Sequence, residues 1–233
     1  RLELVPPLSL PRAPTVVRRM AELLQDPKFL GNVLATLQAW VVGLAIAILI
    51  TVPLGTWIGT SKLASRMTAP VIEFMRPIPS VALIPIGILL WGQGFAMKII
   101  LVAYATSWPI LFNTIYGVHD VDPIAAQTAR CFGLNRLAIL RRISLPSAAP
   151  FIFTGIRISA SIGLIVVVGA ELLASADSGI GSYILFVSLN GGHMDSVLAG
   201  AAIAGIVGAL INGLFGVIDR RVFAWRYLGT QPQ

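Results

Sequence analysis

Long apolar stretches alternate with short clusters of charge along this chain. Five stretches carry almost no charged side chain, and they cover residues 29–61, 77–97, 99–118, 148–170 and 196–218. Each is near or above the ~20 residues that an α-helix needs to cross a bilayer. Arg157 is the one charged residue within the fourth stretch. The pattern predicts an all-α polytopic membrane protein with five transmembrane helices in this chain.

The amino-acid composition agrees with a membrane protein and argues against disulfide-bonded, cysteine-metal and nucleic-acid-binding proteins. Hydrophobic residues make up 56% of the 233 positions, charged residues 12%, and the mean hydropathy is +0.85. The single cysteine, Cys131, excludes an internal disulfide and a cysteine-based metal cluster. The net charge of +7 comes from dispersed arginines without a recognisable nucleic-acid-binding fold, so we expect no nucleic-acid partner.

Basic residues lie mainly at one end of the predicted spans. Three clusters fall on the same side of the membrane: Lys62, Arg66 and Arg76; Arg130, Arg136, Arg141 and Arg142; Arg220, Arg221 and Arg226. Because cytoplasmic flanks of membrane helices are enriched in Lys and Arg, this side and the C-terminus are expected to be cytoplasmic.

An odd number of spans then places the N-terminal segment outside, although it carries five basic residues. We expect a further, sixth N-terminal helix to be missing from the chain, which begins at Arg1 without an initiator methionine. The predicted organisation is an external amphipathic segment at 1–30, a transmembrane domain at 31–219 with a cytoplasmic loop at about 119–147, and a cytoplasmic tail at 220–233.

The loop at 119–147 has the local chemistry of two short helices joined by a sharp turn. Asp122 is a typical N-cap and Pro123 suits a first helical turn. Gly133 supplies a left-handed residue that ends a helix, and Asn135 caps a second helix closed by Leu145-Pro146. Apolar residues on one face make this unit suited to a groove on a partner.

The same loop resembles the cytoplasmic coupling loop of ABC importer permeases, the inner-membrane components of binding-protein-dependent transport systems. That pattern is Glu-Ala-Ala, three residues, Gly, nine residues, Ile-x-Leu-Pro, and Gln127 and Thr128 replace its first two residues here. By this resemblance the ATPase-coupling residues are Gln127, Thr128, Ala129, Arg130, Phe132, Gly133, Leu134, Ile143, Leu145 and Pro146.

Two further segments resemble the nitrate, sulfonate and taurine branch of this family: residues 76–85, and Glu171-Leu-Leu followed by Gly179-Ile-Gly181-Ser-Tyr183. The resemblance implies a type I ABC importer fold, a homodimer in the inner membrane, two ATP-binding subunits and an extracytoplasmic substrate-binding protein. It implies a small anion or organic acid, such as a sulfonate or nitrate, as the solute.

The sequence holds no motif for chemistry of its own. It contains no Gly-x-x-x-x-Gly-Lys-Ser/Thr loop, so ATP and Mg are expected to bind to a partner ATPase. It contains no His-Glu-x-x-His motif or nucleophile with a neighbouring base, so we expect neither catalysis nor a metal site. The alternatives are a secondary transporter or channel without an ATPase, a membrane enzyme or scaffold, and, for the loop alone, a basic segment resting on anionic lipid.

Candidate pathway residues are those with features that are unfavourable in contact with lipid. Prolines break a helix, and irregular backbone at membrane depth lines a cavity or is buried in protein. Intramembrane charges face a bundle interior or water. These rules select Arg76, Pro77, Pro79, Pro85, Arg157, Ser161 and Glu171. The alternative is that the prolines only kink the helix, Arg157 extends to the headgroups and Glu171 marks the outer boundary.

Two stripes of small residues predict close helix packing. Gly43, Ala47, Thr51, Gly55 and Gly59 form the first, and Ala201, Gly205, Ala209 and Gly213 form the second. Packing within the chain is the favoured interpretation of both, with a dimer contact as the alternative.

Overall fold

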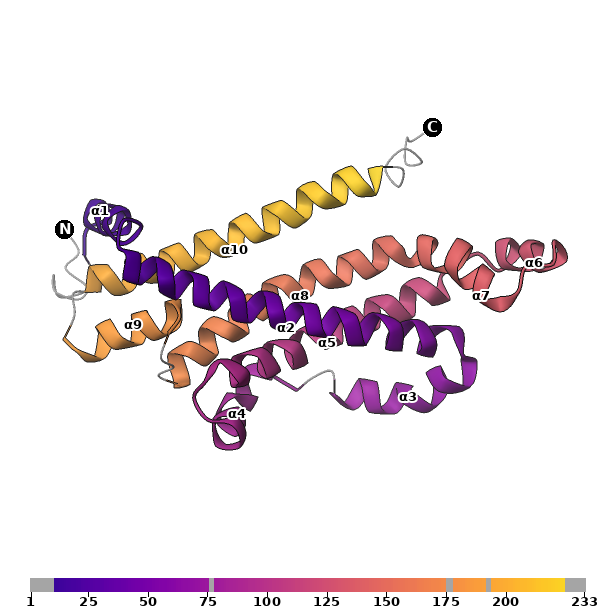
Figure 1. Cartoon of the computed structure of the whole chain (residues 1–233), viewed down its shortest axis with the longest axis horizontal. Helices are drawn as coiled ribbons and strands as arrows, with labels where there is room; N and C mark the ends of the chain where they lie inside the picture. Colours follow the sequence, from indigo (N-terminus) through magenta and orange to yellow (C-terminus); the bar gives the residue numbers. More distant parts are fainter. Residues whose placement is uncertain (1–10, 76–77, 175–177, 192–193, 225–233) are drawn as a thin grey trace, which may run out of the picture. The chain divides into compact units, whose positions relative to one another are not determined.

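The computed structural model describes residues 11–75, 78–174, 178–191 and 194–224, which are almost entirely helical (Figure 1). In chain order the elements are α1 (Ala13–Leu23), α2 (Pro27–Thr60), α3 (Lys62–Met75), η1 (Ser80–Leu83), α4 (Ile84–Trp91), α5 (Phe95–His119), α6 (Pro123–Cys131), α7 (Arg136–Ile139), η2 (Leu140–Ser144), α8 (Leu145–Ala174), α9 (Ile180–Leu189) and α10 (Met194–Val222).

Four of the five predicted spans are confirmed as single long apolar helices. They are α2, α5, α8 and α10, and each is long and apolar enough to cross a membrane. A fifth span is present only if α3 and the segment η1–α4 together count as one broken span. The prediction of an all-α membrane fold therefore holds for the residues that the structure describes.

The predicted span at 77–97 is not one continuous helix, in keeping with the prolines that were expected to bend or break it. The described part begins with the 3₁₀ turn η1, continues as the eight-residue α4 and ends at Trp91. Gly92 then turns the chain with a φ of 73°, and Phe95 already belongs to α5. Pro79 precedes η1 and Pro85 opens α4, where a missing N–H is tolerated, so the prolines set the start of short helices. The sequence reading also missed α3, which it treated as a basic flank.

The first of two compact units comprises Arg1–Gly43, Pro79–Ala103 and Gly163–Ile211. Part of its core is a cluster of Leu23, Phe29, Ala199 and Ile203. The guanidinium of Arg19 ties α1 to α10 by donating to the hydroxyl of Ser196 at 2.9 Å. Arg19 also donates to Glu22, and this hydrogen bond lowers the pKa of that exposed carboxyl.

The second unit comprises Leu44–Ile78, Tyr104–Ile162 and Asn212–Gln233. Here α2 and α5 pack closely through glycines of the first small-residue stripe. A Cβ added at Gly55 would lie 2.9 Å from the Cβ of Thr114, and one at Gly59 would lie 3.0 Å from that of Val118. These contacts are too short for a side chain, so they confirm packing within the chain for the first stripe.

The second stripe does not pack within the chain, contrary to the favoured interpretation. Its four residues, Ala201, Gly205, Ala209 and Gly213, are all exposed on α10. The helix instead buries Ser196, Ala199, Gly200 and Ile203. Residues two positions apart on an α-helix point in nearly opposite directions, so burial of Ala199 and Ile203 leaves Ala201 and Gly205 uncovered.

Candidate functional site

The loop between α5 and α8 folds locally as its sequence predicts. The Asp122 carboxylate accepts a hydrogen bond from the backbone N–H of Ile124 at 2.8 Å, with Pro123 in the first turn of α6. The amide oxygen of Asn135 accepts from the N–H of Ala138, also at 2.8 Å, and so caps α7. Both predicted N-caps are confirmed, and α6 and α7 follow the end of α5 (Figure 1).

The turn between these helices depends on Gly133. Its φ is 78°, its N–H donates to the carbonyl of Arg130 at 2.9 Å, and the N–H of Leu134 donates to the carbonyl of Ala129 at 3.1 Å. This pair of bonds is a Schellman motif, which satisfies carbonyls at a helix C-terminus. A Cβ at Gly133 would meet nothing within 4 Å. The requirement for glycine is therefore conformational rather than steric.

The sequence predicted that the second helix ends at Leu145-Pro146. The structure shows that it does not end there. From α7 the chain continues through the π-helical turn η2 into α8, and the N–H of Leu145 donates to the carbonyl of Leu140, five residues back. The wider π turn changes the hydrogen-bond register just before Pro146, which has no N–H to donate. The loop is consequently joined to a span without a break in the helix.

The predicted coupling residues divide into an exposed surface and its support. Phe132 has 80% of its surface exposed, and Ile124 and Leu137, with 69% and 55%, are exposed on the same loop. Gln127, Thr128, Arg130, Gly133 and Pro146 are also exposed, Ala129 is buried, and Leu134, Ile143 and Leu145 are half-buried. Apolar side chains among arginines suit the groove of another protein better than they suit water.

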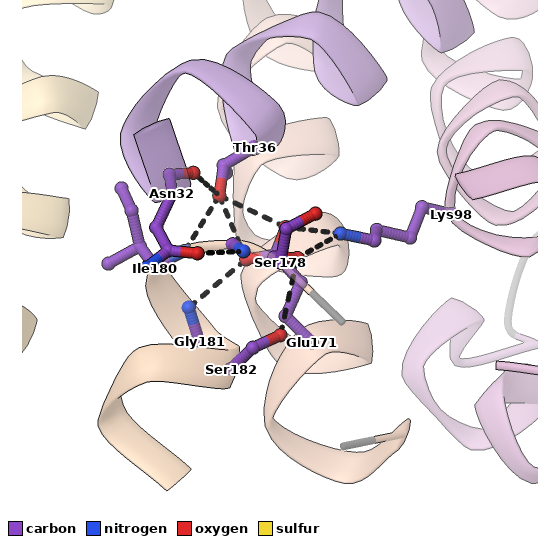
Figure 2. Close-up of polar contacts among 9 residues, drawn as sticks. Asn32, Thr36, Lys98, Glu171, Ser178, Ile180, Gly181 and Ser182 are labelled. Atoms are coloured by element: carbon purple, nitrogen blue, oxygen red, sulfur yellow. Dashed lines mark hydrogen bonds and ion pairs between the residues drawn. The ribbon is translucent and has the colours of Figure 1, made fainter. Parts of the chain in front are cut away.

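Glu171 lies in a buried polar cluster of the first unit, shown in Figure 2. Its carboxylate pairs with the ammonium of Lys98 at 3.0 Å and accepts from the Thr36 hydroxyl at 2.9 Å and the Gly181 N–H at 3.0 Å. The side chain of Glu171 is 0% exposed and that of Lys98 is 2% exposed. Lys98 also donates to the carbonyl of Ser178.

The cluster holds the backbone at the start of α9 against α2. The N–H of Gly179 donates to the Asn32 amide oxygen, and the N–H of Ile180 donates to the Thr36 hydroxyl oxygen, both at 2.9 Å. Gly179 has a φ of 136°, and a Cβ there would collide with the carboxylate of Glu171. The spacing Gly179-x-Gly181 is thus explained by the close approach of Glu171.

Sequence reasoning singled out Glu171 but missed its partners. Lys98 lies between the predicted spans at 77–97 and 99–118, where a charged residue is ordinary. Asn32 and Thr36 resemble any polar residues in an apolar helix. The useful signal is a lone lysine between two apolar runs, because an isolated buried charge needs an opposite charge nearby.

Arg157 lies in the second unit and is half-buried. Its Nε donates to the amide oxygen of Asn212 on α10 at 3.1 Å, and among the described residues it forms no ion pair with Glu73. Arg157 is twelve residues into α8 and Asn212 is ten residues from the end of α10, so each is about 15–18 Å along its helix. Arginines within membrane-spanning helices generally face the bundle interior or a water-filled cavity.

Of the remaining pathway candidates, Ser161 follows Arg157 by one turn of α8, whereas Pro79, Pro85 and Glu171 belong to the first unit. Ser161 is exposed on α8, Pro79 and Pro85 are exposed near η1 and α4, and Glu171 is engaged by protein groups. Arg76 and Pro77 lie outside the described residues. The pathway role of these residues stays a prediction.

Residues 51–224 match the family described as the binding-protein-dependent transport system inner membrane component. The nitrate import permease protein of Leptolyngbya laminosa is 31% identical over 216 residues, which cover 89% of this chain and 77% of that protein. The taurine transport system permease protein of Escherichia coli strain K12 is 31% identical over 232 residues, covering 96% of this chain and 82% of that protein.

Solved structures share the fold. An inward-facing form of the MetNI methionine ABC transporter has a TM-score of 0.69 at 19% identity, covering 87% of this chain and 97% of that chain. A bacterial alginate ABC transporter in complex with alginate pentasaccharide-bound periplasmic protein also reaches 0.69, at 16% identity over 88% of this chain and 82% of that chain. With a family match over residues 51–224 and this fold, the chain belongs to the binding-protein-dependent inner membrane components, the permease subunits of ABC importers.

Proposed function

We propose that this permease subunit carries a small anion across the inner membrane, driven by a partner ATPase that docks on the loop at 127–146. The observation that carries the proposal is the capped turn of that loop, which presents Phe132 on a rigid glycine motif continuous with α8. An exposed aromatic on a fixed turn is suited to transmit force between proteins, because little motion is lost in the turn itself. This arrangement has no use in a secondary transporter or channel.

We further propose a homodimer, two ATP-binding subunits that bind ATP and Mg, and an extracytoplasmic binding protein that delivers the solute. The uncovered stripe on α10 supports the homodimer, since small residues let membrane helices approach closely. The loop and the C-terminus are taken to face the cytoplasm because the basic clusters lie on that side.

A solute with an anionic group is supported by the charge of Arg157 within α8 and by the names of the two relatives: nitrate is an anion, and taurine carries a sulfonate group. Arg157 and Ser161 are the residues of the second unit that we place on the path. Asn212 accepts from the Nε of Arg157, and the two terminal nitrogens are the donors that we propose bind the solute.

Reconstitution tests the function. Proteoliposomes that contain the permease, its ATPase and its binding protein are expected to accumulate taurine or nitrate only when ATP is present on the ATPase side. The permease alone should give no uptake down a solute gradient. Uptake by the permease alone, without ATP, would instead establish a secondary transporter or channel.

Arg157→Gln is expected to reduce uptake in this assay while ATPase copurification stays at the wild-type level. A hydrogen bond to a charged group contributes about 1.5–3 kcal/mol, so the loss should be roughly ten- to hundredfold. The matched control is Arg220→Gln, which removes an exposed arginine near the end of α10, outside the coupling loop. Equal uptake by both variants would mean that Arg157 only reaches toward the headgroups.

The orientation is tested by cysteine accessibility in a Cys131→Ser background. Ser147 and Ser188 are both exposed and lie on the two sides that we assign to the cytoplasm and the exterior. In intact cells an impermeant maleimide should label Ser188→Cys and leave Ser147→Cys unlabelled until the cells are opened. The reverse labelling pattern would invert the proposed topology.

A further inference from the structure

The second unit contains a cavity of about 910 Å³ between the coupling loop and the ends of two spans. Its walls come from the end of α2, the first residue of α3, the end of α5 and the segment from α6 to η2. The volume lies within the ~300–1,000 Å³ typical of sites for small ligands. The cavity shares Arg130 and Leu134 with the predicted coupling residues, so the inference below rests on the proposed function.

The lining of the cavity is positively charged. Lys62, Arg130 and Arg136 all contribute to it, and no lining residue is acidic. Within the part of the chain that the structure describes, none of these three side chains forms an ion pair or donates a hydrogen bond. Three uncompensated cations around one cavity repel one another and attract an anion.

The cavity is also amphipathic. Val118, Leu134, Ile139 and Leu140 give it apolar walls beside the cations. The apolar helix α2 ends at Thr60, and both Thr60 and the adjacent Lys62 line the cavity. Basic segments that flank a membrane span on the cytoplasmic side are attracted to anionic lipid headgroups.

The coupling loop therefore has two different sides. Phe132, Ile124 and Leu137 do not line the cavity and are free for a protein partner. Arg130 and Arg136 line the cavity on the side of the spans. An ATPase that covers the first set does not need the second.

We propose that this cavity binds the phosphate of an anionic phospholipid headgroup through Lys62, Arg130 and Arg136. The bound phosphate would bridge the start of α3 to α6 and α7, and so fix the coupling loop to the membrane spans. Its glycerol and upper acyl carbons would lie on Val118, Leu134 and Leu140. The loop's transmission of ATP hydrolysis then depends on lipid charge.

The test measures lipid binding to the delipidated full-length chain by native mass spectrometry, with phosphatidylglycerol, phosphatidylcholine and glycerol 3-phosphate as probes. The cavity variant carries Lys62→Gln, Arg130→Gln and Arg136→Gln. The control variant carries Arg66→Gln, Arg141→Gln and Arg142→Gln, three exposed cations that do not line the cavity. Lys62→Gln alone serves if the triple variant does not fold.

Wild type and control are expected to bind phosphatidylglycerol more tightly than phosphatidylcholine. In the cavity variant this preference should fall at least about tenfold, which is the loss expected from roughly one charge-assisted hydrogen bond. Equal retention by the cavity and control variants would overturn the proposal. Glycerol 3-phosphate binding as tightly as the lipid would assign the cavity to a soluble phosphate and also overturn it. So would a cavity variant that keeps its lipid but no longer copurifies with the ATPase, because the cations would then belong to the protein interface.

Discussion

Replacing Lys98 with methionine is expected to prevent stable folding of the permease. The substitution leaves the buried Glu171 carboxylate without its counter-ion, and breaking a buried pair on one side costs about 3–5 kcal/mol. That is a large share of the roughly 5–15 kcal/mol that stabilises a typical protein. The measurements are the yield of monodisperse protein in detergent and its apparent thermal unfolding temperature.

The exposed Lys28 supplies the matched control, and a second substitution separates charge from shape. Lys28→Met should behave as wild type. The double variant Lys98→Met with Glu171→Gln removes both charges and keeps an acceptor oxygen for the Gly181 N–H, so it should recover most of the yield. If Lys98→Met alone unfolds at the wild-type temperature, the ion pair does not hold this cluster together.

The second large effect is expected for Gly133→Val. This substitution should impair coupling between the ATPase and the permease, and it should leave folding intact. A β-branched residue at a φ of 78° costs about 1–2 kcal/mol, and the chain relieves this by leaving the left-handed conformation. Phe132 would then point elsewhere. We expect ATPase binding to weaken roughly five- to thirtyfold, with solute-stimulated ATP hydrolysis reduced to match. Copurification and hydrolysis assays measure both quantities.

Cys131→Val is the matched control, since it places the same side chain two residues earlier, at an exposed position within α6. Asn135 is not a neutral control site because its side chain caps α7. A Gly133→Val permease that binds its ATPase as tightly as Cys131→Val, and transports equally well, would remove the turn from the coupling mechanism. Its insertion in the membrane should stay unchanged, because a Cβ at Gly133 contacts no neighbouring atom.

The coupling loop was predictable because its chemistry is local. An N-cap and a glycine C-cap each satisfy backbone groups within a few residues, so Asp122, Asn135 and Gly133 are recognisable without knowing what surrounds them. The wrong prediction that the second helix ends at Leu145-Pro146 also came from a local signal. Proline normally signals the end of a helix, and the π turn that lets this one continue is not encoded by any single residue.

The polar cluster around Glu171 was not predictable, because its residues are far apart in the sequence. Lys98 and Glu171 are 73 positions apart, and Thr36 and Glu171 are 135 apart. A charge in an apolar segment predicts that a partner exists without saying which one. The same limit explains Arg157, whose amide partner Asn212 lies 55 residues away and was not considered.

By itself the sequence determined the helical membrane class, four of its spans, the two caps and the glycine turn of the coupling loop, and the resemblance to importer permeases. These follow from hydropathy and from backbone hydrogen bonding, which act along short lengths of chain. Only the tertiary structure decided that Glu171 is neutralised by Lys98, that the stripe on α10 is left uncovered, and that three cations share one cavity. Each of these depends on which helix faces meet, because burial and charge pairing are properties of neighbours in space rather than in sequence.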